Sequence, residues 1–263
     1  MKRFLNDLKK YKSYIIYRTK ADLKAEVTGS YLSWLWLVLE PLCFMLIYTF
    51  IHTLIFNTKL EYYTAFVFVG LTIWNFFSKT LLASVKLVKA NRDTVTKVYV
   101  PKWVLLLCKV SVNFVKFLIS FGLVIITIAI YKIPLSWNVL WVAIIFIVTI
   151  LFTFGLSAIF MHLGVFIEDL SNLTAIGIRM MFYMSGVFFV IENRIGEPWN
   201  AILSKCNPIA AMIIQLRRSL SIIHLTPSYE IIIFWGLVSV LICIVGIKTI
   251  YKYENTYVKV MKS

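Results

Sequence analysis

Long apolar runs alternate with short polar segments along most of this chain. Each run is close to the roughly twenty residues that a helix needs to cross the hydrocarbon core of a bilayer. The six runs cover residues of about 34–56, 63–85, 103–131, 140–166, 173–191 and 231–250. Helices satisfy their own backbone hydrogen bonds in lipid, and the alternation typical of a membrane barrel is absent. The pattern predicts an all-α integral membrane protein, with six transmembrane helices in one domain over residues 1–263.

The first segment, residues 1–31, is basic but carries a periodic apolar stripe. The apolar residues at helical spacing are Phe4, Leu8, Tyr11 and Ile15. Lysines flank them, which is typical of an amphipathic helix lying in the membrane interface. A basic tail that only fixes orientation is the alternative interpretation, and the two can hold together.

Residues 192–228 combine prolines with apolar stretches that are too short to span a membrane. The prolines are Pro198, Pro208 and Pro227. Stretches of this length, such as residues 209–216, favour interfacial or re-entrant helices before the last span.

The cations indicate how the chain is oriented. Outside the predicted spans, residues 1–31 hold eight lysines and arginines, residues 86–102 hold five, and the chain from residue 248 holds four; the opposite side holds six. Cytoplasmic segments are enriched in lysine and arginine, so we expect both termini in the cytoplasm. The net charge of +15 accompanies 60% apolar residues and no basic module with stacking aromatics, so nucleic acid is not an expected partner.

Signatures of chemistry are missing from the sequence. There is no P-loop and no GxSxG elbow, and His52, His162 and His224 are scattered without metal-ligand spacing. We expect no catalytic residue, no metal and no cofactor bound by this chain. A membrane-embedded glycan enzyme stays open as an alternative, with a site sought among the charged residues of 192–228, namely Glu192, Glu197, Arg217 and Arg218.

A cationic stripe lies in the third predicted span. Lys102, Lys109 and Lys116 are seven residues apart, almost two helical turns, so they share one face. Lys116 is the hardest to place against lipid, because fifteen apolar residues follow it. One interpretation is a water-filled path suited to phosphate or pyrophosphate. The other is snorkelling to the interface, or pairing with a carboxylate such as Glu40 in the first span. The candidate residues for a translocation path are Lys109, Asn113, Lys116 and Glu40.

Four motifs, in order, resemble the membrane subunit of ABC-2 type polysaccharide exporters. The motifs are TGSYLSWLWLVLEP at 28–41, GLTIWNFFS at 70–78, NRDTVTKVYVPKWVLLL at 91–107, and FYMSGVFFVIE at 182–192 followed by NP at 207–208. That group includes exporters of O-antigen, teichoic acid and rhamnose-rich cell-wall polysaccharides. The resemblance covers nearly the whole chain.

The resemblance implies a homodimer of six-span subunits around a central channel, with two ATPase chains beneath. The assembly would export an undecaprenyl-linked polysaccharide across the bacterial plasma (inner) membrane, and ATP and Mg would bind to the partner ATPase. Membrane lipids would surround the dimer. An ABC-2 permease for a drug or a lipid is the alternative cargo class.

Residue roles also follow from the resemblance. The loop 86–101 would form a coupling helix that docks on the ATPase, through Asn91, Arg92, Asp93 and Thr94. The turn at Glu168 and Asp169 would be a second contact. Short extracellular helices in 192–228 would gate the exit, and the outer gate candidates are Ser185, Gly186 and Pro208.

Overall fold

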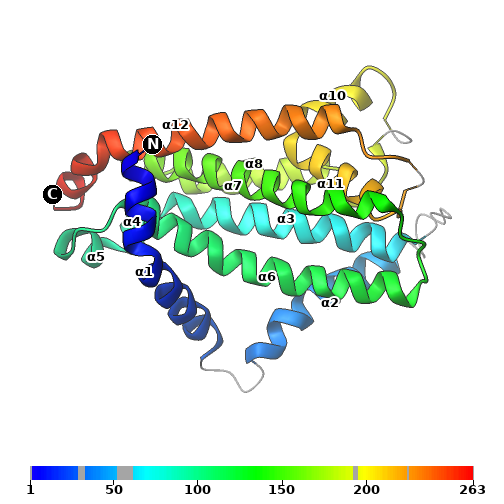
Figure 1. Cartoon of the computed structure of the whole chain (residues 1–263), viewed down its shortest axis with the longest axis horizontal. Helices are drawn as coiled ribbons and strands as arrows, with labels where there is room; N and C mark the ends of the chain where they lie inside the picture. Colours follow the sequence, from blue (N-terminus) through cyan, green and yellow to red (C-terminus); the bar gives the residue numbers. More distant parts are fainter. Residues whose placement is uncertain (1, 29–32, 52–61, 192–194, 224, 263) are drawn as a thin grey trace.

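In the computed structural model of this chain, residues 2–28, 33–51, 62–191, 195–223 and 225–262 are described. Over these residues the chain is almost entirely helical and contains no strand. The long helices lie side by side in a bundle, and α1 (Lys2–Val27) crosses them at one end (Figure 1).

Four helices in the described part are long and apolar enough to cross a membrane. They are α3 (Tyr63–Val85), α6 (Lys102–Ile130), α7 (Trp141–Phe166), which the 3-10 turn η2 (Trp137–Leu140) precedes, and α12 (Tyr229–Lys262). The predicted spans 63–85, 103–131 and 140–166 match the first three closely. An all-α membrane fold is therefore confirmed.

The core of the bundle is α3. It contacts α2, α6, α7, α8 and α11, and most of its side chains are buried on all sides. Elsewhere glycines bring helices into backbone contact: a Cβ on Gly155 of α7 would lie 2.7 Å from the Cys243 nitrogen of α12, and one on Gly246 would lie 2.9 Å from the Gly155 oxygen. Small residues at such contacts let membrane helices approach closely.

Two helices are shorter than the predicted spans. The first, α2 (Ser33–Ile51), has Pro41 inside it, and residues 52–56 of the predicted span lie outside the described residues. The second, α8 (Leu170–Met184), has 15 residues, or about 22 Å of helix, against the predicted span 173–191. It ends where Gly186 adopts a positive φ of 61°, a conformation that glycine tolerates and that turns the chain.

Helix α1 confirms that residues 2–27 form a helix with an apolar stripe, while its place in the membrane interface stays a prediction. Its apolar stripe faces the bundle: the Phe4 ring lies 4.6 Å from the Trp103 ring, and Ile15 is buried. Both termini and the short helices α4 (Leu87–Ala90) and α5 (Arg92–Lys97) lie at the same end of the bundle (Figure 1).

The opposite end carries α10 (Trp199–Cys206) and α11 (Pro208–Ser219) (Figure 1). Almost every residue of α11 is buried, and the helix packs on α3 and α7. One boundary differs from expectation: α12 continues to Lys262, whereas the last span was predicted to end near residue 250. This extension stays helical because Tyr257 and Glu254 are buried against other helices.

Candidate functional site

Two of the predicted path lysines lie against α1. The Lys109 ammonium is 3.0 Å from Oε1 of Glu26, and Lys116 pairs with Oε2 of the same carboxylate. All three side chains are about one-quarter to one-third exposed. Lys116 is thus paired with a carboxylate, one of the alternatives considered, but Glu40, given as an example of such a partner, is not the one: the partner is Glu26, in the last turn of α1.

Glu40 has a different partner. Its Oε1 accepts a hydrogen bond of 2.6 Å from Lys79 of α3, and this ion pair joins α2 to α3. The ion pair explains how a carboxylate is tolerated about two turns inside an apolar helix.

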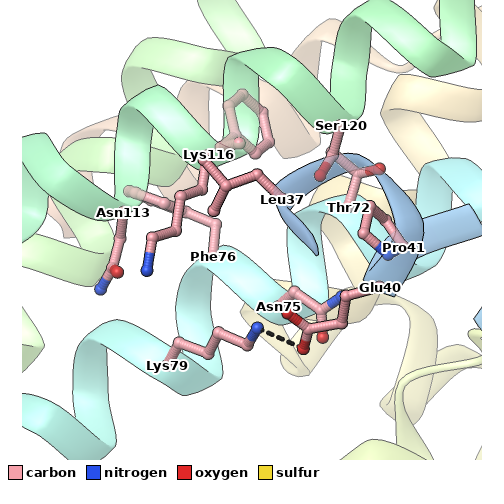
Figure 2. Close-up of a pocket in the computed structure, with 11 residues that line it drawn as sticks. Leu37, Glu40, Pro41, Thr72, Asn75, Phe76, Lys79, Asn113, Lys116 and Ser120 are labelled. Atoms are coloured by element: carbon pink, nitrogen blue, oxygen red, sulfur yellow. Dashed lines mark hydrogen bonds and ion pairs between the residues drawn. The ribbon is translucent and has the colours of Figure 1, made fainter. Parts of the chain in front are cut away.

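A polar pocket lies between α2, α3 and α6 (Figure 2). Glu40 and Lys79 lie on one side of it and Lys116 on the other. The remaining lining residues are Leu37, Pro41, Thr72, Asn75, Phe76, Asn113, Phe117 and Ser120. The cavity of about 40 Å³ accommodates a few water molecules and no sugar ring, so one chain alone does not form a glycan path here.

The charges around this pocket do not cancel. Among the described residues, Lys79, Lys109 and Lys116 form ion pairs with Glu26 and Glu40 alone, which leaves one excess positive charge. Burial by itself raises the pKa of Glu26, but hydrogen bonds and charge from the two lysines outweigh burial and hold that pKa below its ordinary value. Glu26 is therefore an anion at neutral pH, held by two cations.

Asn113 and Lys102, on the same helix, make structural contacts. Asn113 is buried and donates a 3.0 Å hydrogen bond to Thr80 of α3. The Lys102 side chain is buried and donates to the Val100 carbonyl at 3.2 Å. These contacts hold α6 in register with α3 and fix the end of the α5–α6 connection.

The predicted coupling residues lie on an exposed segment. Arg92 and Asp93 are exposed at the start of α5, and Thr94 is half-buried. Asn91 is held from two sides: its amide donates to the Leu87 carbonyl at 2.9 Å, and its oxygen accepts from Arg18 of α1 at 3.2 Å. The segment therefore presents charges to solvent while it contacts α1.

The turn at Glu168 and Asp169 lies beside the exposed segment that holds α4 and α5. Glu168 is 3.6 Å from Lys89 of α4 and 90% exposed, so its remaining surface is open to a partner. Asp169 lies directly before α8. The structure thus brings Glu168, next to Asp169, to the predicted coupling segment, which lies about 75 residues away in sequence.

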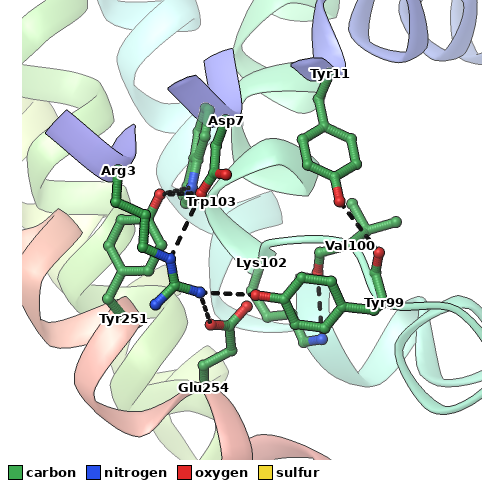
Figure 3. A network of polar contacts seen from close by, with 9 residues as sticks. All are labelled: Arg3, Asp7, Tyr11, Tyr99, Val100, Lys102, Trp103, Tyr251 and Glu254. Carbon is green, nitrogen blue, oxygen red and sulfur yellow. Dashed lines mark hydrogen bonds and ion pairs between the residues drawn. The ribbon is translucent and has the colours of Figure 1, made fainter. Parts of the chain in front are cut away.

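A polar network joins both ends of the chain to this segment (Figure 3). Arg3 donates to the Tyr99 hydroxyl at 2.8 Å and pairs with Glu254 of α12 at 3.2 Å. Tyr251 of α12 donates to Asp7 at 2.7 Å and accepts from the Trp103 indole at 2.8 Å. Helices α1, α6 and α12 are fixed to one another here.

The outer gate candidates also meet. The Asn207 side chain accepts from the backbone of Ile209 and Ala210, capping α11 directly before Pro208, and donates to the Ser185 hydroxyl at 3.3 Å. The carbonyl of Gly186 accepts from Arg217 at 2.8 Å. The end of α8 and both ends of α11 are therefore bonded together.

The residues considered for an enzyme do not converge. Arg217 is buried against backbone carbonyls, Arg218 donates to Ser228, and Glu197 is exposed; Glu192 lies outside the described residues. His162 contacts the Tyr257 hydroxyl at 2.8 Å, and His52 and His224 are also outside the described residues. No group of three potential metal ligands occurs in the described part of the chain.

Three relevant charges were missed from the sequence: Glu26, Lys79 and Arg179. Lys79 and Arg179 could have been found, because an ionisable residue within an apolar helix is itself a signal of function. Arg179 is exposed on α8 and lines a groove with Trp74, Phe182 and Tyr183. Glu26 carries no such signal, since it lies in a charged segment.

Comparison with known proteins places these features in a family context. A family model described as ABC-2 type transporter matches residues 17–221. The chain is 29% identical, over 94% of both chains, to an O-antigen export system permease protein RfbA of Klebsiella pneumoniae. It is 25% identical to a protein of the same name from Myxococcus xanthus, over 92% of this chain and 93% of that one.

Proposed function

This chain belongs to the ABC-2 type transporter family, and from that premise we propose that it is the membrane subunit of an ATP-driven exporter of a lipid-linked polysaccharide. The main support is that its similarity to O-antigen export permeases extends over nearly the whole length of both chains. The chain would lie in the bacterial plasma membrane as a multi-pass protein. Two copies of a separate ABC ATPase, which binds ATP and Mg, would drive it.

The ATPase would dock at the end of the bundle that holds α5 and both termini. Exposed Arg92 and Asp93, with Asn91 and Thr94 beside them, offer charged groups to a soluble partner. Glu168 and Asp169 extend the same surface, since Lys89 ties Glu168 to the coupling segment. This end would face the cytoplasm.

Closure of the ATPase would reach the membrane through α1 and α12. The network of Arg3, Tyr99 and Glu254 ties the coupling segment to both helices. Packed helices move as rigid bodies, so a displacement at α5 is transmitted along them.

A homodimer would supply a channel between two copies of the chain. The pocket between α2, α3 and α6 does not admit a sugar ring. Arg179 and Tyr183, which is 70% exposed, lie on the outer face of the short helix α8. A charged side chain in that position is costly against lipid, so a second copy or an aqueous path beside α8 accounts for it.

The helices α10 and α11 would close the outer end of the channel. Ser185, Gly186 and Pro208 lie where α8 and α11 are bonded together, so a movement of α11 would shift the end of α8.

Deletion of the gene tests the proposal. Loss of surface polysaccharide, with accumulation of the lipid-linked glycan inside the cell, is the expected result. The purified chain should also carry an ABC ATPase with it as two copies of each subunit. Normal surface glycan together with a new sensitivity to drugs would instead assign a different cargo.

A further inference from the structure

We propose that Lys109 and Lys116 form a binding site for the diphosphate of a polyprenyl-linked substrate, and that Glu26 occupies this site until the substrate displaces it. The inference rests on the proposed function and names the anion and the residues that receive it. Glu26 would thus act as a stand-in anion that keeps the site closed at rest.

The first support is convergence. Lys109 and Lys116 are seven residues apart on α6, which separates their backbones by about 10 Å along the helix. Their ammonium groups nevertheless meet at the two oxygens of one carboxylate on another helix. One lysine is enough to neutralise Glu26, so the second cation needs a different explanation.

The second support is the charge of the site. Glu40 and Lys79 cancel each other, and Glu26 cancels only one of the two α6 lysines. Without Glu26 the lysines carry two positive charges, which a diphosphate neutralises. Exchange of Glu26 for a diphosphate therefore improves the charge balance, whereas departure of Glu26 alone leaves two cations repelling each other in a half-buried place.

The third support is the position of Glu26. It lies in the last turn of α1, where the helix dipole disfavours a carboxylate. The local helix thus gains nothing from an acidic residue at this position. The benefit of Glu26 is therefore its contact with the two lysines of α6.

Displacement of Glu26 would alter the contacts between α1 and the coupling segment. The same helix that carries Glu26 donates from Arg18 to Asn91 and from Tyr11 to the Tyr99 carbonyl. A shift of the end of α1 away from α6 therefore alters contacts beside the ATPase docking surface. Binding of the substrate anion would in this way change the surface on which the ATPase docks.

The test measures binding of a fluorescent polyprenyl diphosphate to the full transporter, permease with its ATPase, in nanodiscs. Glu26→Gln should bind the probe about fivefold more tightly than wild type, because it removes a competing anion. Lys109→Gln with Lys116→Gln should weaken binding about tenfold or more, and Lys109→Arg with Lys116→Arg should restore it. Lys132→Gln, the same change at an exposed position two residues beyond the far end of α6, is the matched control and should bind as wild type does.

Unchanged or weaker binding by Glu26→Gln would overturn the proposal, and misfolding cannot imitate the expected gain in affinity. A polyprenol without phosphate should not compete for the site. Free pyrophosphate should compete only weakly; if it competed as well as the lipid diphosphate, the site would be one for a soluble phosphate and the lipid assignment would fail.

The outcome is separable from that of the proposed function. If deletion abolishes surface glycan and the ATPase co-purifies, while Glu26→Gln and the lysine variants all bind like wild type, only the diphosphate site is refuted. If the ATPase does not co-purify and surface glycan is normal, the exporter itself is refuted.

Discussion

Arg217 is a fully buried cation that donates its hydrogen bonds to backbone carbonyls. Its guanidinium donates to the carbonyls of Phe66, Gly186 and Val187 at 2.7–3.0 Å and lies 3.3 Å from the centroid of the Phe66 ring. Two of these carbonyls belong to the turn after α8, where the helix leaves its own acceptors unsatisfied. The planar fork of arginine reaches all three at once, which a lysine cannot do.

Arg217→Lys should therefore destabilise the protein. We expect a loss of about 2 kcal/mol, or roughly 4–8 °C in the unfolding temperature in detergent, because at least one buried carbonyl loses its donor. Arg218→Lys, next along the chain and partly exposed, should shift it far less. Equal shifts for the two variants would contradict the role given to Arg217.

Glu26 leads to a prediction about pH. Its pKa lies below the ordinary glutamate value of 4.5, so its contacts contribute fully above that value and are lost as the pH falls through the lowered pKa. The difference in unfolding temperature between wild type and Glu26→Gln should be constant from neutral pH to about 5.5 and shrink only in stronger acid. A difference that fades near neutral pH would show that the pKa is not lowered.

For single residues, the sequence predicted the helix face on which a side chain lies better than it predicted the residue that the side chain contacts. The period of seven correctly placed Lys109 and Lys116 on one face, because a helix fixes that geometry locally. Their common partner, Glu26, depends on how α1 folds back over α6, which the spacing of residues in either helix does not contain. The partner of Glu40 was missed for the same reason.

Among the elements, α5 is expected to carry the ATPase contact. Arg92→Glu should reduce association of the ATPase, or its stimulation, by about tenfold or more while insertion is unaffected, since charge reversal at an interface is strongly unfavourable. Co-purification and ATPase assays measure this effect. Lys205→Glu, an exposed position on α10 at the opposite end, is the control; unaltered coupling by Arg92→Glu would remove α5 from the interface.

The cap of α11 gives a second prediction for an element. Asn207→Ala removes the acceptor for the backbone N–H groups of Ile209 and Ala210 and the bond to Ser185, and should cost about 1 kcal/mol. Asn207→Ser keeps a capping oxygen and should recover part of that loss. Thermal unfolding of the two variants measures the difference, and equal stabilities would argue that the cap is unimportant.

The elements that hydropathy alone determines were predictable, and those that depend on tertiary contacts were not. The spans at α3, α6 and α7 agree with their apolar runs within a few residues at each end. The end of α8 at Met184 depends on the turn at Gly186. The extension of α12 to Lys262 depends on contacts of Tyr257 with α7 and of Glu254 with α1. Hydropathy does not record either contact.

For the molecule as a whole, orientation follows from the grouping of cations at the end that holds α5. In a variant without its natural cysteines, Asp93→Cys should react only with reagents that reach the cytoplasm, because Asp93 is 91% exposed there. Leu135→Cys, in the connection after α6, should react from outside. Labelling of residue 93 from outside would invert the topology and remove the basis for ATPase docking.

The clasp between Arg3 and Glu254 has a practical consequence for anyone who expresses this protein. Because Arg3, in the first turn of α1, holds Glu254, about two turns before the end of α12, a fusion partner joined tightly to either terminus competes with the clasp. Truncation before residue 254 would remove the Arg3–Glu254 ion pair, while α1 keeps its contacts with α6. An affinity tag on a long flexible spacer would leave the clasp intact, and comparing such a preparation with a truncated one would separate loss of anchoring from loss of transport.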